Sequence, residues 1–229
     1  MYDIAFNGVN AKTKGLIVQH RPSIPAPEEE IEIIKIAGKD GILTGDSRLN
    51  TIDISVDFAF KVSTDTNFAT QYRTIKEYLQ GSGELIQSDD TAWFYKVNYV
   101  HITDVERTMK KYATLKAVFS CDPYTYRVDG KTEVSVSRTI TNNYDLCHPK
   151  WVVYGSGTRT LTVNGTSVSV TGNNVIIIDT DRMITTIQTT GGFANTRLTG
   201  DYEALYLNPG SNTATCTSTL KCIPNWRKR

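Results

Sequence analysis

The chain has 229 residues, enough for one large domain or two small domains with a buried core. Its 25 Lys and Arg residues nearly balance its 24 Asp and Glu residues, so it lacks the cation excess of a protein that binds nucleic acid by neutralising phosphates. No apolar run is long enough to span a bilayer, and Asp3 lies where a signal peptide would be basic. We therefore expect a soluble protein made in the cytoplasm, with no membrane insertion and no specific nucleic-acid binding.

The first half of the chain contains short strand patterns and one helix pattern. Residues 2–6 and 15–18 are typical of short strands. Over residues 51–62, apolar side chains alternate strictly with mostly polar ones, which indicates a half-buried antiparallel strand that anchors the first core. Apolar and aromatic residues then recur at helical spacing, which predicts a helix over about 66–80 packed on that sheet (Phe68, Tyr72, Ile75 and Leu79). Asp65 or Thr66 would cap its start and Gly81 would end it.

Three consecutive acids, Glu28, Glu29 and Glu30, precede an apolar strand at residues 31–36 and a turn that contains Lys39 and Asp40. One interpretation is the solvated start of a strand. The other is an electrostatic contact between subunits, because a row of exposed charges helps to fix the register between partners. The residues alone leave both interpretations open.

The first half closes with an antiparallel strand series. Strands are predicted at residues 84–87, 93–99 and 112–121, with a turn at 88–90 and a long polar hairpin loop at 101–112. Asp122-Pro123 should end the last strand, because proline has no N–H to donate to a ladder. We therefore expect two domains, residues 1–130 and residues 131–229.

The second half has many short strand patterns separated by Asn, Gly and Pro. Strands are predicted at residues 132–139, 151–154, 161–163, 168–170, 175–178, 205–207, 213–217 and 220–223. Asn164-Gly165 is a strong signal for a tight hairpin turn between two of them. This pattern predicts a β-sandwich or a jelly roll.

The cysteines and histidines offer few candidate ligands. Cys147, His148, Cys216 and Cys222 could be written as a zinc site, but no two of the cysteines form the tight pair that zinc sites use. We therefore expect ordinary buried thiols at all four cysteines, Cys121 included. Cys216 and Cys222 could face each other across a hairpin, but we expect them to be reduced after assembly in the cytoplasm.

Other catalytic and ligand motifs are missing from the sequence. His20, His101 and His148 are far apart, and no P-loop, dinucleotide fingerprint or nucleophile elbow occurs. Asp179-Thr-Asp181 lacks the glycine and glutamate of a calcium loop and is interpreted as a turn at the end of a strand. The basic residues 227–229 are interpreted as a solvated tail. We expect no enzymatic activity, no cofactor and no metal.

Several motifs in a fixed order resemble the distal tail proteins (Dit) of long-tailed bacteriophages. In the first half these are "GKDG.L" from Gly38, where the family usually has arginine in place of Lys39, the helix followed by a short strand and "SDD", and "CDPY.Y" from Cys121. In the second half they are "P.WVVYGSG" and "LTVNG", then "VIIIDTDRM", "LNPGSNT" and "IPNWR". The resemblance covers nearly the whole chain.

The resemblance implies a fold and a role. The expected fold is mainly β, with an N-terminal β-barrel-like (split-barrel) domain carrying one helix and a C-terminal galectin-like β-sandwich. The implied role is a structural hub in the virion, at the tail tip or baseplate, assembled in the host bacterial cytoplasm. Six copies would form a ring that joins the tail tube protein to the tail-associated (tail-fibre or lysin-like) protein and to a receptor-binding protein, with DNA passing through the ring channel.

Two further hypotheses concern residues. The candidate contacts between subunits are Glu28, Glu29, Glu30, Lys39 and Asp40. The alternative function is a carbohydrate-binding, lectin-like module that contacts sugars of the host cell wall, for which Trp151 and Trp226 are candidates by residue type. Trp151 lies in an apolar strand, which favours a place in the core.

Overall fold

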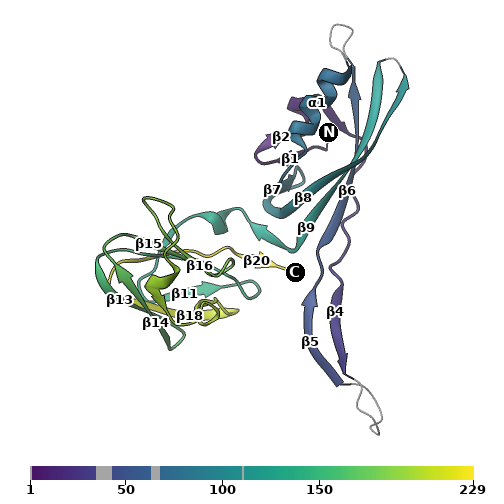
Figure 1. The fold of residues 1–229 in the computed structure, drawn as a ribbon. Coiled ribbons are helices and arrows are strands. Elements are labelled where there is room, and N and C mark those ends of the chain that lie inside the picture. The colour runs from purple at the N-terminus through teal and green to yellow at the C-terminus, as the bar shows by residue number, and fades with distance from the viewer. Residues whose placement is uncertain (1, 35–42, 63–67, 110) are drawn as a thin grey trace. The chain divides into compact units, whose positions relative to one another are not determined.

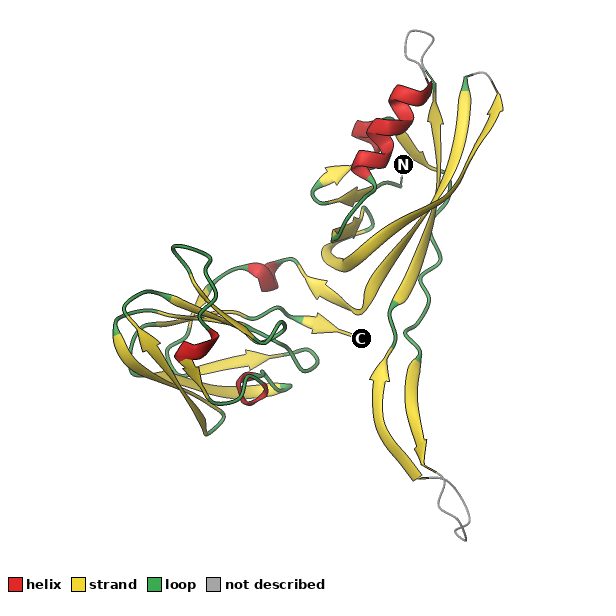
Figure 2. Ribbon diagram, in the orientation of Figure 1, coloured by secondary structure: helices red, strands yellow, loops and turns green. Residues whose placement is uncertain are grey.

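The computed structural model describes residues 2–34, 43–62, 68–109 and 111–229, and the chain divides into two compact units. The first unit is Met1–Thr125 with Arg229, and the second is Tyr126–Lys228. Strands predominate in both, and the described residues contain a single α-helix, α1 (Phe68–Tyr78) (Figures 1 and 2). The prediction of a mainly β protein with one helix is confirmed.

The first unit is built on a large antiparallel sheet that curls into a half-barrel. Its strands follow the order β2-β1-β7-β8-β9-β6-β3. Strand β20, whose residues belong to the second unit, pairs with β9, which itself runs on to Arg127. The bounds are β1 (Ile4–Phe6), β2 (Val9–Asn10), β3 (Leu16–Val18), β6 (Ile52–Lys61), β7 (Gly83–Gln87), β8 (Asp90–Met109), β9 (Tyr112–Arg127) and β20 (Arg227–Lys228), with a 3-10 turn η1 (Ala11–Lys14).

Strand β6 supplies the centre of the first core, as its alternation predicted. Every second side chain is buried, and Ile54, Val56, Phe58 and Phe60 are fully buried. These residues share one cluster with the inward side chains of β9 and with Ile75 and Leu79 of the helix segment. Each such side chain contributes about 1.5–3 kcal/mol on burial. The helix therefore packs on this sheet as predicted, and Gly81 adopts the left-handed conformation expected after a helix. The predicted N-caps, Asp65 and Thr66, lie outside the described residues.

Two predictions for the first unit are wrong. The predicted loop at 101–112 is mostly strand, because β8 continues to Met109 and β9 begins at Tyr112. Ile102 and Val105 pack against the core, so two apolar contacts and the sheet pairing outweigh the polar composition. Strand β9 also runs through Asp122-Pro123 to Arg127. Its pairing with β6 ends at Cys121 opposite Ile52, so Pro123 lies beyond that ladder and interrupts none of its bonds.

The second unit consists of two five-stranded antiparallel sheets around one core, as predicted for a β-sandwich. One sheet has the order β10-β19-β12-β15-β16: β10 (Val134–Ser135), β12 (Lys150–Val153), β15 (Ile176–Asp179), β16 (Ile184–Ile187) and β19 (Leu220–Ile223). The other has the order β11-β18-β13-β14-β17: β11 (Thr139–Asn142), β13 (Gly157–Val163), β14 (Thr166–Gly172), β17 (Leu198–Thr199) and β18 (Gly210–Cys216). That this sandwich is galectin-like stays a prediction.

The Asn164-Gly165 hairpin is confirmed, since both residues have positive φ (49° and 88°) between β13 and β14. Two other predictions for this unit are wrong. The single strand expected at 132–139 is two, because the chain crosses from one sheet, through β10, to the other, through β11. The strand expected at 205–207 is the 3-10 turn η4 (Glu203–Leu205) followed by an isolated bridge from Leu207 to Cys147. The buried Leu205 and Leu207 anchor this turn in the core. The remaining 3-10 turns are η2 (Asp129–Lys131) and η3 (Asn195–Arg197).

Candidate functional site

The predicted contact residues belong to a hairpin of β4 (Glu29–Ile34) and β5 (Leu43–Leu49). Figure 1 shows these strands as a two-stranded ribbon, and among the described strands each pairs only with the other. The register places Glu30 opposite Arg48 and Ile31 opposite Ser47, and it shifts between Ile31 and Ile33. A two-stranded ribbon is at best marginally stable by itself in water. Among the described strands, no third strand adds to the pairing of β4 with β5.

The hairpin carries several exposed charged side chains. The Arg48 guanidinium contacts the Glu30 carboxylate at 2.8 Å, and both side chains are more than half exposed. Arg229 contacts Glu29 at 3.5 Å. Glu28 is exposed, and its carbonyl accepts a hydrogen bond from the Asn50 N–H. Exposed pairs of this kind contribute only about 0–1 kcal/mol, so these glutamates add little to the stability of one chain.

Strand β4 also exposes two isoleucines, on the face that they share with Glu29. Ile31 is 45% exposed and Ile33 is 55% exposed, and residues two apart on a strand share a face. Beside them a shallow groove is lined by Glu30, Ile31, Glu32, Ser47 and Arg48. Neighbouring apolar side chains on a ribbon open to water are typical of a surface that binds another chain. The hairpin thus combines an apolar contact area with charges that can set its register.

The structure describes three of the five predicted contact residues. Glu28, Glu29 and Glu30 are exposed on this hairpin. Lys39 and Asp40 lie outside the described residues. Sequence reasoning missed Ile31 and Ile33, which it assigned to an apolar strand without asking which face is covered. The signal was present in the run Glu-Glu-Ile-Glu-Ile-Ile, because its alternation puts Ile31 and Ile33 on one face together with Glu29, and puts Glu30 and Glu32 on the other.

The candidate zinc ligands do not form a site. Cys147 and Cys222 are buried in the core of the second unit, and burial raises the pKa of both thiols. Cys216 is on β18 and Cys222 is on β19, strands of different sheets, so the two do not face each other across a hairpin. All four cysteines are free thiols. Across the parts of the chain that the structure describes, no three His, Cys, Asp or Glu residues are grouped as metal ligands would be.

These burials predict an order of thiol reactivity. The pKa of Cys121 is raised from 9.0 to about 12, mainly by burial. A raised pKa leaves little thiolate at pH 8, and thiolate is the species that alkylates. We therefore expect iodoacetamide at pH 8 to modify the half-buried Cys216 first, and the other three cysteines only when the chain unfolds. Mass spectrometry of peptides from the native protein tests this order, with a urea-unfolded sample as control. Modification of Cys121 or Cys222 as fast as Cys216 in the native protein would contradict it.

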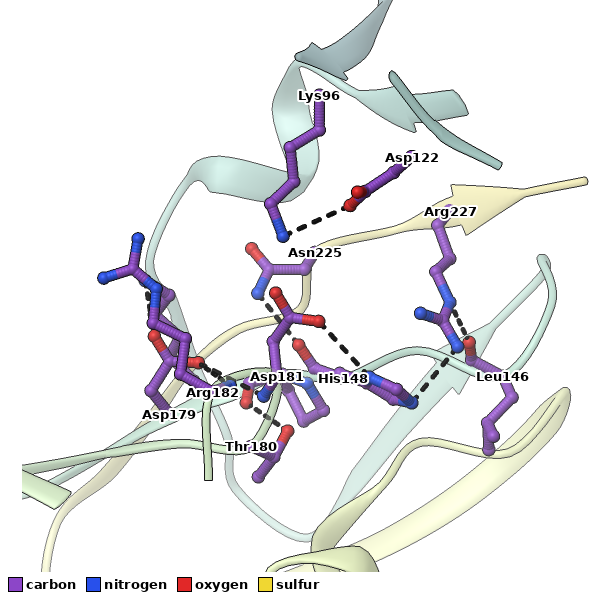
Figure 3. Close-up of polar contacts among 12 residues, drawn as sticks. Lys96, Asp122, Leu146, His148, Asp179, Thr180, Asp181, Arg182, Asn225 and Arg227 are labelled. Carbon is purple, nitrogen blue, oxygen red and sulfur yellow. Dashed lines mark hydrogen bonds and ion pairs between the residues drawn. The ribbon is translucent and has the colours of Figure 1, made fainter. Parts of the chain in front are cut away.

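His148 is the centre of a polar cluster in the second unit (Figure 3). Arg227 Nη2 lies 3.1 Å from His148 Nε2, and Asp181 Oδ1 lies 3.4 Å from Nδ1. A guanidinium can only donate, so Nε2 accepts and Nδ1 carries the proton towards Asp181. The imidazole also stacks on Tyr206, with ring centroids 4.1 Å apart. His148 therefore links its own loop to Asp181, Tyr206 and Arg227.

Contacts in and near this cluster test two interpretations from the sequence, a turn at residues 179–181 and a solvated tail at residues 227–229. Asp179 accepts hydrogen bonds from the backbone N–H groups of Asp181 and Arg182, and its other oxygen contacts Lys150 at 2.9 Å (Figure 3). Residues 179–181 therefore form the turn that was predicted. The solvated tail predicted at residues 227–229 is wrong for Arg227, which is buried on β20 and donates to the Leu146 carbonyl at 2.6 Å. The planar guanidinium of Arg227 finds acceptors inside the second unit, at Leu146 and His148, so this side chain is not solvated.

The aromatic rings proposed for sugar binding are engaged elsewhere. Trp151 is fully buried, as its apolar strand predicted, and its indole N–H donates to the Leu205 carbonyl at 2.9 Å. Trp226 is half-buried against the same core and packs beside Tyr144. A sugar-binding platform needs an open ring face, and Trp151 offers none.

Comparison with known protein families identifies the family of the chain. Residues 10–125, about half of the chain, match the family model of the phage tail protein RIFT-related domain. The chain belongs to this phage tail protein family. The matched range holds the helix, most of the half-barrel sheet and the β4–β5 hairpin.

Solved structures extend the likeness to the whole chain. The Dit protein of phage SPP1, described as a paradigm of the hub adsorption apparatus in phages that infect Gram-positive bacteria, matches with a TM-score of 0.64 and 16% identity, over 97% of each chain. A chain of the phage P2 baseplate in its activated conformation with Ca matches with a TM-score of 0.55 and 12% identity, over 100% of this chain and 97% of that one. At these identities the likeness is one of fold. The predicted resemblance to distal tail proteins is thereby confirmed.

The comparison with curated proteins found no match. Within the described residues, no helix has the length and apolar character needed to cross a membrane.

Proposed function

We propose that this protein is the distal tail hub of a long-tailed bacteriophage, a structural protein of the virion whose six copies close into a ring at the tail tip. Membership of the phage tail protein family and the fold shared with a hub protein and a baseplate chain support a structural role in the tail. The observation that carries the ring is the β4–β5 hairpin, which exposes Ile31 and Ile33 beside a row of glutamates.

Ring closure follows from the kind of contact that such a hairpin makes. Its surface does not match itself, because an acidic and apolar ribbon needs a partner surface with cations and an apolar patch. A patch that binds a different patch on the next copy gives a head-to-tail contact, and such contacts close into a ring when the rotation allows it. The hairpin would supply one side of each seam, with Lys39 and Asp40 beside it in sequence.

The ring would have two kinds of partner. One side would receive the tail tube protein, and the other the tail-associated protein and a receptor-binding protein, while DNA passes through the channel without sequence-specific contacts. The nearly balanced charge of the chain fits a passage that does not retain DNA. We propose a structural and not a catalytic role, because the family that the chain belongs to and the solved structures that share its fold are tail, hub and baseplate proteins.

Charge reversal at the three glutamates tests the proposal. We expect the triple variant Glu28→Lys, Glu29→Lys, Glu30→Lys to lower the ring fraction at least tenfold at low salt, because three attractive contacts per seam become repulsive. Light scattering and negative-stain imaging measure it. Glu77→Lys, an exposed reversal on α1, is the matched control and should leave ring assembly unchanged. Rings of the triple variant at wild-type abundance, at low and at ordinary salt, would count against this seam.

A further inference from the structure

An open hollow in the second unit lies where β13 and β14 meet, with η3 beside it. Its volume is about 540 Å³, and it is lined by Thr171, Gly172, Asn173, Asn174, Thr196 and Arg197, together with Gly157. This volume is within the ordinary range of small-ligand sites, about 300–1,000 Å³. The lining contains hydroxyls, amides and one guanidinium but no carboxylate. The lining therefore offers many hydrogen-bond donors and no acidic side chain.

A buried arginine holds the backbone of two residues that line this hollow. Arg159 is only 2% exposed, since it shares the inward face of β13 with Leu161 and Val163. Its guanidinium donates to the carbonyls of Gly155 (2.8 Å), Gly172 (2.9 Å) and Asn174 (3.1 Å), and the last two residues line the hollow. Buried charges are normally paired with an opposite charge. Among the described residues Arg159 has no carboxylate partner, and its Nε–H has no acceptor.

A second arginine lies over the same backbone segment. The half-buried Arg197 runs beside Gly172, so close that a Cβ built on residue 172 would lie 2.8 Å from Arg197 Nη1. No ion pair holds this guanidinium within the described residues. Arg197 is near enough to help burial lower the pKa of Arg159. Two guanidinium groups thus contact one peptide segment, and no acid in the lining offsets their charge.

We propose that this hollow binds an oxyanion, namely a phosphate group carried by a polyol or a sugar. Arg197 is the direct ligand, because its planar fork matches two phosphate oxygens. Arg159 adds positive potential from below through the polarised carbonyls it holds, and the low dielectric around it strengthens that field. Thr171, Thr196, Asn173 and Asn174 can hydrogen-bond the remaining oxygens and the hydroxyl groups of the carrier. The proposal is independent of ring formation.

Calorimetric titration of the full chain tests the site. The probes are inorganic phosphate, glycerol 3-phosphate and glycerol. We expect glycerol 3-phosphate to bind with an affinity that falls as salt is raised, and glycerol alone not to bind. Tighter binding of glycerol 3-phosphate than of inorganic phosphate identifies the polyol phosphate as the natural class, whereas equal binding assigns the site to free phosphate.

Two variants make the result specific. Arg197→Gln should weaken binding by about 10- to 100-fold, the loss expected when a hydrogen-bonded charge is removed. Arg182→Gln, an exposed arginine of the same unit outside the hollow, should leave binding unchanged. An unchanged circular dichroism melting curve for Arg197→Gln separates lost binding from misfolding. Absence of binding by both phosphates, or binding that Arg197→Gln does not weaken, would overturn the proposal.

Discussion

Replacing Trp151 with alanine should lower the free energy of unfolding of the second unit by about 3–5 kcal/mol, the range for a large aromatic side chain lost from a packed core. Trp151 is fully buried at the centre of β12, between β15 and β19. Its loss would leave a cavity and would leave the Leu205 carbonyl without its donor. A unit of about this size is stabilised by only 5–15 kcal/mol, so much of its stability would be lost.

Urea unfolding followed by circular dichroism measures this effect, and native-state hydrogen exchange assigns it to residues 126–228. Two controls separate its causes. Trp151→Phe keeps most of the ring but removes the indole N–H, so it should cost clearly less than Trp151→Ala. Trp226→Ala removes a half-buried ring and should also cost less. A loss of less than about 1 kcal/mol for Trp151→Ala would contradict the central place given to this residue.

Replacing Ile31 and Ile33 together with serine should abolish ring assembly without unfolding the chain. The two side chains are about half exposed within one copy, so their loss costs little stability there. Full burial of an exposed isoleucine contributes about 1.5–3 kcal/mol, and about half of that gain is still open to these two side chains. Together they would strengthen each seam by about 1.5–3 kcal/mol, or roughly 10- to 10²-fold in affinity. The effect is repeated at every seam of a closed ring.

The matched control for this double variant is Phe193→Ser. Phe193 is 79% exposed and lies in the second unit, so its replacement removes an exposed apolar side chain away from the hairpin. We expect it to assemble as the unmodified protein does. The concentration dependence of the mass in light scattering compares the three proteins. Assembly of Ile31→Ser/Ile33→Ser at unchanged concentration would remove the hairpin from the interface.

The elements that the sequence predicted correctly are those in which one local pattern decides the outcome. Alternation over residues 51–62 admits a single buried face, and Asn164-Gly165 suits a turn that needs two positive φ angles. The failures come from interactions that are distant in sequence. Residues 101–109 are polar, yet they form part of a strand in the sheet. Pro123 is tolerated because it lies beyond the last β6–β9 pair, which is Ile52 opposite Cys121. Arg227 leaves the expected tail because its acceptors, Leu146 and His148, lie about 80 residues earlier.

In the hairpin and in the hollow, too, some features follow from the local sequence and others depend on tertiary packing. The glutamates were predictable as exposed charges, because three adjacent acids have no local reason to be buried. That Ile31 and Ile33 lie uncovered could not be predicted, since it depends on which strands pair with β4. Arg159 offered a readable signal, because it has the same parity as Leu161 and Val163 on β13. Its proximity to Arg197 arises only when η3 packs beside β14, which sequence spacing does not indicate.

The mass of the purified full chain in solution, measured by light scattering with negative-stain images of the same fraction, tests the central claim most directly. The chain has a mass of 25.5 kDa, and we expect a species of six copies that appears on the grid as rings with a central channel. A mass of one copy at every concentration, with no rings in the images, would contradict it.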